Sequence, residues 1–307
     1  MNESVSEDGR EITAKINSDE VIKEWEERAE RARGIKLVTA LGAKTDLGRI
    51  RENNEDKYEF FMPEDEDTLA IKGAFYAVAD GMGGHAAGQI ASELALKTAI
   101  KAYYSDSSPI LEESLRAAFQ TSNALIYDVA RTISERAGMG TTMTALVLRG
   151  EEVFTAHVGD SRCYRLRGGK LEQLTEDHTW VNEQVKRGLM SQEEAELSPF
   201  RNVITRSLGN TPSVEVDIIS DELKINDVFL LCSDGLTSEV SDDEIRDVLV
   251  KSSPSKAAWD LVELALDHGG RDNCTVLIVA IRDIIKPEDQ DEPRKKRKGL
   301  AGILGLK

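Results

Sequence analysis

A chain of 307 residues, 40% hydrophobic and 31% charged, has a globular composition and is long enough to bury the core of a domain of about 240 residues. Its formal net charge of −17 argues against nucleic acid as a general partner, because Lys and Arg bind a phosphate backbone. With no signal peptide and no apolar run of the roughly 20 residues that a membrane helix needs, we expect a cytoplasmic protein. Three cysteines without C-x-x-C spacing are expected to be buried thiols: Cys163, Cys232 and Cys274.

The first segment, residues 1–36, is dense in Glu, Lys and Arg. Residues 18–34 predict a surface helix with Ser18 as its N-cap, and few apolar positions face a core. We interpret 1–36 as a charged helical extension that lies on the domain or is tethered to it. A regulatory or partner-binding role is the alternative.

From Leu37 the pattern becomes that of a domain, with a strand entering a turn and then an acidic loop at 63–68. An apolar strand at 74–79 stops at Asp80, and glycines lead into a helix over 90–104. The strand fixes the carboxylate, and the glycines let backbone and substrate come close. An ordinary turn with a solvated Asp80 is the alternative. A dinucleotide-binding turn is disfavoured, because Asp80 would face the pyrophosphate and tight hairpins follow downstream.

The middle of the chain predicts a second amphipathic helix over 109–135 and then a β meander, with short turns that make its neighbouring strands antiparallel. Successive helices with one apolar stripe each suggest a layer packed on a sheet. Later segments predict two more strands, two more helices and a final strand. The expected strands are 141–149, 152–158, 161–167, 170–174, 214–219, 227–233 and 274–281, and the later helices are 241–249 and 254–270.

Two further segments stand apart from this pattern. Residues 178–204 predict one or two short polar helices with a proline break, as an insertion over the sheet edge. The tail from Lys286 holds five consecutive basic residues followed by a short apolar segment. We expect this tail to be disordered, and a weak contact with an anionic membrane surface or a partner is the alternative.

Carboxylates stand at a strand end or in a glycine turn at four separate places, and an acidic pair lies close to Arg51. They are Asp80, Asp160, Asp234, Asp272 and the pair Glu55–Asp56. Clustered carboxylates repel each other unless cations lie between them, and oxygen-only ligands suit Mg²⁺ or Mn²⁺. We therefore predict an acidic binuclear site that activates water for in-line displacement at phosphorus. The planar fork of Arg51 matches two phosphate oxygens.

An ordered set of short motifs resembles the metal-dependent serine/threonine protein phosphatases of the type 2C, or PPM, family in its bacterial form. The motifs are RxxNED (51–56), DGMGGH (80–85), GTT (140–142), VGDSR (158–162), LTEDH (174–178), SDGL (233–236) and RDN (271–273). The resemblance covers about residues 37–282. It implies an α+β fold, a two-sheet antiparallel β-sandwich flanked on both faces by pairs of α-helices. The catalytic domain would span 37–283, with 284–307 as the tail.

The resemblance also implies roles for metal-binding residues, carried over position by position. Asp80 would bridge both metals, and the Gly81 carbonyl would face one of them. Asp234 and Asp272 would hold the first metal, while Glu55 and Asp56 would act on the metals partly through water. Asp160, together with Asp234, would correspond to a third-ion site of bacterial members.

Other residues would act on substrate or support the site. Arg51 would bind substrate phosphate, Asn273 would support Asp272, and residues 179–204 would form a mobile flap that shapes substrate access. His85 is a candidate general acid. A structural role for His85, capping the following turn, is the alternative, because three residues separate it from the Asp80–Gly81 pair where eukaryotic members have one His directly.

The function implied is hydrolysis of phosphoserine and phosphothreonine in proteins by metal-activated water, without a covalent phosphoenzyme. Expected substrates are phosphoproteins, including a serine/threonine kinase, and a monomer is expected, membrane-peripheral if the basic tail binds lipid. A binding module that has lost catalysis is disfavoured, since no metal-binding Asp is lost. A phosphatase dedicated to one partner, such as a sigma-factor regulator, with the N-terminal helix as docking element, stays open.

Overall fold

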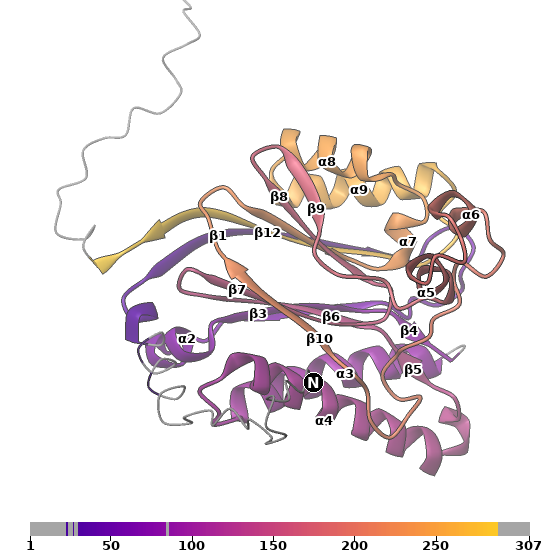
Figure 1. The fold of residues 1–307 in the computed structure, drawn as a ribbon, viewed down its shortest axis with the longest axis horizontal. Coiled ribbons are helices and arrows are strands. Elements are labelled where there is room, and N and C mark those ends of the chain that lie inside the picture. The colour runs from indigo at the N-terminus through magenta and orange to yellow at the C-terminus, as the bar shows by residue number, and fades with distance from the viewer. Residues whose placement is uncertain (1–22, 24–26, 28–29, 84–85, 288–307) are drawn as a thin grey trace, which may run out of the picture.

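Two five-stranded antiparallel sheets lie face to face at the centre of the molecule (Figure 1). The computed structural model describes residues 23, 27, 30–83 and 86–287. The first sheet has the strand order β1 (Lys36–Asp46), β12 (Cys274–Ile285), β11 (Val228–Cys232), β8 (Arg162–Arg167) and β9 (Lys170–Gln173). The second has the order β10 (Asp217–Glu222), β7 (Glu152–Val158), β6 (Met143–Arg149), β3 (Ala74–Ala79) and β2 (Lys57–Phe61).

A pair of helices covers the outer face of each sheet (Figure 1). On the second sheet lie α3 (Ala86–Ser105) and α4 (Leu111–Thr132), and on the first lie α8 (Asp242–Lys251) and α9 (Pro254–Asp267). Apolar side chains fill the two helix–sheet layers and the space between the sheets. The predicted α+β sandwich with flanking helix pairs is therefore confirmed.

The central strand β3 explains why the sequence there is continuously apolar. Phe75 and Ala77 pack against the helices, whereas Tyr76 and Val78 pack between the sheets. A strand covered on both faces needs apolar side chains at every position, and not only at alternate ones. This burial holds the end of β3, and the Asp80 that follows it, in place.

The predicted meander is two hairpins in two different sheets. Strands β6 and β7 pair in the second sheet and β8 and β9 pair in the first, so the expected antiparallel neighbours are confirmed. Between them the chain crosses from one sheet to the other at residues 159–161. Periodicity along one strand carries no information on which sheet it joins. The crossing places Asp160 at an end of the sandwich.

Some local predictions were wrong. The expected acidic loop at 63–68 instead starts helix α2 (Glu66–Lys72), because Asp65 Oδ2 accepts the backbone N–H of Thr68 at 2.8 Å and caps it. The strand expected at 214–219 begins only at Asp217, since Val214 and Val216 pack on the helix layer instead. Further short elements are β4 (Gly81–Met82), η1 (Ser134–Arg136), β5 (Gly140–Thr141), α5 (Trp180–Lys186), α6 (Gln192–Glu196) and α7 (Asp234–Thr237).

Both predicted terminal segments fall largely or partly outside the described residues. The proposed N-cap Ser18 and most of its helix lie there, as does the tail from residue 288. Within the part of the chain that the structure describes, no helix has the length and apolar character needed to cross a membrane.

Candidate metal centre

The end of the sandwich shared by β4, β5 and α7 collects the predicted carboxylates (Figure 1). Asp80 directly follows β3, Asp234 opens α7 just after β11, and Asp272 lies two residues before β12. They line one cleft of about 410 Å³ together with other predicted residues, namely Arg51, Glu55, Gly81, Asp160 and Asn273. Asp56 is buried close by, near enough for its charge to raise the pKa of Asp80. His85 lies outside the described residues.

The backbone of Asp80 is held by the threonines of the GTT motif. Its N–H donates to Thr142 Oγ1 at 3.0 Å, and its carbonyl accepts from Thr142 N at 2.9 Å and from Thr141 Oγ1 at 2.7 Å. Thr142 Oγ1 also lies 2.7 Å from Ser161 Oγ, next to Asp160. The strand end that carries Asp80 is therefore fixed by hydrogen bonds from buried residues.

A serine joins Asp56 to the other sheet. Ser233 Oγ donates to Asp56 Oδ2 at 2.6 Å and accepts the N–H of Thr275 at 3.0 Å. Ser233 precedes Asp234 and is the N-cap residue of α7, but its side chain makes no cap hydrogen bond. Its hydroxyl positions a carboxylate instead.

Asn273 fastens the loop that carries Arg51 and Glu55. Its Oδ1 accepts the N–H of Glu55 at 2.8 Å, and its Nδ2 donates to the carbonyls of Leu47 at 2.8 Å and Asn53 at 2.9 Å. Arg51 Nη2 donates to Asp272 Oδ2 at 2.6 Å, and this hydrogen bond raises the pKa of the guanidinium. The loop and the start of β12 thus form one unit.

Two glycines allow chain segments to approach closely at the site. A Cβ on Gly88, near the start of α3, would lie 1.9 Å from Glu55 Oε2, and one on Gly235 would lie 1.9 Å from the Asn273 carbonyl. Real Cβ atoms do not come so near. Any side chain at either position would push a neighbouring carboxylate loop away.

Burial and mutual repulsion shift the pKa values of the clustered carboxyls upward. Burial is the main cause in each case: it raises the pKa of Asp56 to about 7 and that of Asp234 to about 6. The pKa values of Asp80 and Asp160 also lie well above their usual range, with the Asp234 charge adding to the effect of burial. A cation bound among these carboxyls would stabilise their ionised forms at neutral pH.

The donor set fits a hard divalent cation. Asp56 Oδ1, Asp160 Oδ1 and Asp234 Oδ1 are buried and have no hydrogen-bond partner within the described part of the chain. Leaving a buried polar atom unpaired costs about 1–3 kcal/mol, so a ligand for these oxygens is expected. In the ranges described, no three His, Cys, Asp or Glu side chains lie close enough together to hold a metal ion by themselves. Mg²⁺ usually keeps several of its water ligands when it binds to a protein. The residues present therefore fit Mg²⁺ or Mn²⁺ held partly through water.

Sequence patterns did not predict an individual role for three residues that hold the site together. Thr142 and Ser233 stood inside recognised motifs, and Ser92, whose Oγ donates to the Glu55 carbonyl at 2.6 Å, lies outside them. Ser233 carried a usable signal, since a serine before a buried Asp–Gly pair can cap a helix or bind a carboxylate. Ser92 carried none, because its partner is 37 residues away.

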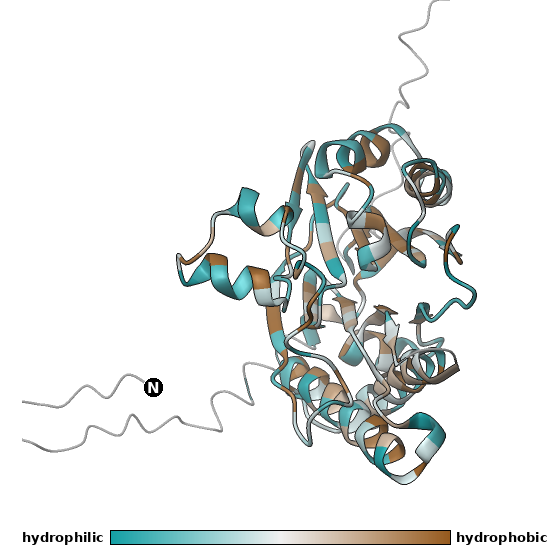
Figure 2. Ribbon diagram, turned by 90° about the vertical axis from the view of Figure 1, so that its right-hand side faces the viewer, coloured by the Kyte–Doolittle hydropathy of each residue, from teal (hydrophilic) through white to brown (hydrophobic). Residues whose placement is uncertain are grey.

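The predicted flap forms a wall beside this cleft. Helices α5 and α6 project from the layered body (Figure 2). A second cavity, of about 770 Å³, lies under them and reaches Asp160 and Asp234. Asn202 of the flap lines both cavities. The two cavities are therefore neighbours, with the carboxylates between them.

The buried carboxylates at the end of this sandwich suit a metal-dependent hydrolase, and comparison with known proteins identifies the family. A family model described as Protein phosphatase 2C matches residues 44–274. A serine/threonine phosphatase stp of Listeria welshimeri is 40% identical over 241 residues, which cover 77% of this chain and 93% of that protein. The serine/threonine protein phosphatase PstP of Mycobacterium tuberculosis is 38% identical over 81% of this chain and 46% of its own length.

Solved structures give the same result. A crystal structure of Mycobacterium tuberculosis PstP has a TM-score of 0.72 and 38% identity over 80% of this chain and 100% of that one. The catalytic domain of PstP in complex with two manganese ions has a TM-score of 0.70 and 37% identity over 81% of this chain and 100% of that one. The chain belongs to the protein phosphatase 2C family, as a bacterial-type serine/threonine protein phosphatase.

Proposed function

We propose that the enzyme hydrolyses phosphoserine and phosphothreonine in proteins at two Mg²⁺ or Mn²⁺ ions held by this carboxylate cluster. The observation that carries the proposal is the set of buried carboxylate oxygens without a partner, on Asp56, Asp160 and Asp234, among the described residues. Bound ions would supply positive charge for the phosphate and a water of lowered pKa. PstP, which shares the fold, holds two manganese ions in its crystal structure.

Within this proposal the residues divide the metal-binding work by position. Asp80, fixed at the end of β3, would bridge the ions, and the Gly81 carbonyl beside it would face one of them. Asp234 and Asp272 would hold the first ion. Glu55 and Asp56 would act partly through water, and Asp160 would join Asp234 in holding a third ion.

Arg51 would bind the substrate phosphate. Its side chain lines the cleft and is about half exposed, at 55%, and within the described part of the chain its guanidinium donates one hydrogen bond, to Asp272 Oδ2. The bond to Asp272 points the guanidinium at the metal site while leaving other N–H groups for phosphate oxygens. Asn273 would act through the loop that it fastens. The role of His85 as general acid stays a prediction.

The proposed catalytic domain would extend over about 37–283, with the rest of 1–36 and 284–307 as appended segments. Strand β1 starts at Lys36 and β12 ends at Ile285, and the two pair in one sheet, so the paired strands extend one to two residues beyond these bounds. The enzyme would act as a cytoplasmic monomer on phosphoproteins, a serine/threonine kinase among them, and the basic tail would allow weak contact with anionic membranes.

The test is phosphate release from a phosphothreonine peptide in EDTA, Mg²⁺ and Mn²⁺, comparing the parent protein with Asp234→Asn. Asp260→Asn, a half-buried residue of α9 that is paired with Lys256 and lies outside the carboxylate cleft, is the matched control. We expect activity only with added metal, lost in Asp234→Asn and kept in the control. A folded parent without activity under any metal would favour the non-catalytic binding module instead.

A further inference from the structure

The flap is a long excursion that is closed at its base. Residues 179–204 leave the body after His178 and return before Arg206. At the base, Trp180 N donates to the Val203 carbonyl and Thr205 N donates to the His178 carbonyl, each at 2.8 Å. Thr179 and Ile204 form an isolated β-bridge. These bonds join the two ends of the flap to each other.

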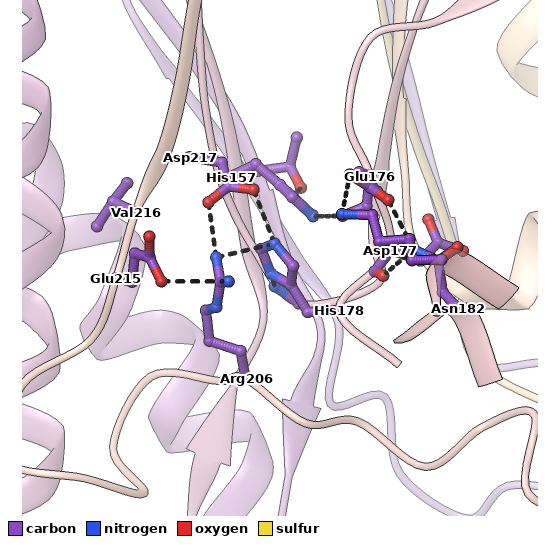
Figure 3. Close-up of polar contacts among 12 residues, drawn as sticks. His157, Glu176, Asp177, His178, Asn182, Arg206, Glu215, Val216 and Asp217 are labelled. Atoms are coloured by element: carbon purple, nitrogen blue, oxygen red, sulfur yellow. Dashed lines mark hydrogen bonds and ion pairs between the residues drawn. The ribbon is translucent and has the colours of Figure 1, made fainter. Parts of the chain in front are cut away.

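A cluster of three polar side chains joins this base to the second sheet (Figure 3). His178 Nε2 lies 3.0 Å from Asp217 Oδ2, and Arg206 Nη1 lies 2.6 Å from Asp217 Oδ1 and 3.0 Å from His178 Nε2. Asp217 is the first residue of β10 and pairs with His157 of β7. One carboxylate on a sheet strand thus contacts a residue at each end of the flap.

The same histidine is bonded to the turn that carries Asp160. Gly159 N donates to His178 Nδ1 at 3.0 Å, and His178 N donates to the Gly159 carbonyl at 2.7 Å. Because Nδ1 accepts, Nε2 carries the proton and donates it to Asp217. The approach of Arg206 Nη1 to Nε2 is then a contact between two donors, and Asp217 accepts from both side chains. Gly159 has φ of +118°, and a Cβ there would lie 2.5 Å from Thr142. The turn is therefore packed against Thr142 on one side and hydrogen-bonded to His178 on the other.

Packing around His178 fixes the orientation of its ring. Its side chain is 8% exposed, and its ring lies 4.8 Å, centroid to centroid, from that of His157. His157 is itself fixed by Thr144 Oγ1 at 2.8 Å and by the Glu176 carbonyl at 3.0 Å. A buried ring with both nitrogens bonded has one orientation. Loss of the Asp217 carboxylate would therefore free the ring to turn and weaken its hydrogen bond to Gly159 N.

We propose that His178, Arg206 and Asp217 form an anchor for the flap, and that this flap anchor also positions Asp160. The three are positioning residues, because none of them lines the carboxylate cleft among the residues described. The flap part of the inference stands on geometry alone. The Asp160 part rests on the proposed metal site.

The first test is limited trypsin digestion of the metal-free protein, comparing Asp217→Ala with Asp221→Ala. Asp221 lies on the same strand, is similarly exposed, and pairs with Arg165 instead of a flap residue. The flap carries exposed trypsin sites at Lys186, Arg187 and Arg201. Loss of charged hydrogen bonds should speed cleavage there roughly tenfold in Asp217→Ala. The same rate in both variants would overturn the anchor.

The second test is Mn²⁺ titration by calorimetry on the same two variants, with kcat and KM for a phosphothreonine peptide. We expect Asp217→Ala to lose one weak Mn²⁺ site or bind it about tenfold less tightly, and to raise the peptide KM, with Asp221→Ala unchanged. Faster proteolysis with unaltered Mn²⁺ binding would overturn the link to Asp160. If Asp217→Ala does not fold, Asp217→Asn replaces it. A parent inactive with every metal would count against the proposed function, while the digestion would still decide on the anchor.

Discussion

The carboxylate cleft and the outer part of the flap differ in how many bonds hold them to the core. Around the cleft, Asp56, Asp80 and Asn273 each bond to residues of a second segment of the core. The flap is joined to the body at its base, and its far part exposes apolar side chains such as Leu189 and Leu197. A buried charged side chain destabilises the fold unless its hydrogen-bond and charge partners are in place, so the carboxylates of the cleft need fixed positions.

The difference suggests a division between chemistry and access. Hydrogen-bonded strand ends keep the repelling carboxyls together, whereas the proposed role of the flap is to shape substrate access. If so, changes at the cleft should lower kcat and metal affinity, whereas changes on the outer flap should leave both alone.

The largest effect is expected from Asp80→Asn. The backbone bonds from Thr141 and Thr142 do not involve the carboxylate, so the fold should persist. Loss of the proposed bridging ligand should lower kcat by at least about 100-fold. Kinetics with saturating Mn²⁺, alongside a thermal unfolding curve, measure this. Parent-like turnover would place the active site elsewhere.

A smaller effect is expected from Ser233→Ala, which touches no proposed metal directly. Asp56 Oδ2 loses its donor and Thr275 N loses its acceptor, at a cost of about 1–3 kcal/mol in the free energy of unfolding. Metal affinity should fall about 10- to 100-fold. Ser255→Ala on α9, which removes an exposed hydrogen bond to the Leu41 carbonyl of β1, is the control. Equal metal affinity in both would show that Ser233 only stabilises the fold.

The pH dependence of the metal-free protein offers a subtler test. Burial raises the pKa of Asp56 to about 7 and that of Asp234 to about 6, above the unfolded value near 4. Between these values the folded state holds more protons, so these groups make the free energy of unfolding decrease as pH rises from about 4 to 7. In EDTA, the drop in Tm from pH 5 to pH 8 should be smaller in Asp56→Asn than in the parent. An equal or larger drop in the variant would contradict this assignment.

The smallest effect is expected from Leu197→Ala on the outer flap. This side chain is 85% exposed, so its loss should change the free energy of unfolding by less than about 0.5 kcal/mol. kcat with p-nitrophenyl phosphate and Mn²⁺ affinity should match those of the parent. A fall in either would break the division between cleft and flap.

The sequence predicted those parts of the fold that local pattern controls. Strand β3 with its terminal Asp80, the helix pairs, and the two hairpins follow from periodicity and turn residues. The pattern did not reveal that residues 159–161 cross between sheets, because a strand reads alike in either one. It also misread 63–68, where Asp65 caps a helix within an acidic run.

For the site, the sequence identified which carboxylates gather but not what holds them. The bonds from Ser233 to Asp56 and from Asn273 to Asn53 join residues 177 and 220 positions apart. The flap anchor is similar, since Asp217 and His178 are 39 residues apart. Such pairings depend on tertiary packing, which single-sequence patterns do not encode.

The most direct measurement is an anomalous difference map from crystals grown with Mn²⁺. The account predicts two strong peaks in the cleft, with Asp80 touching both and with Asp234 and Asp272 on one of them. Peaks away from these residues, in crystals of a protein that is active in solution, would contradict the central claim.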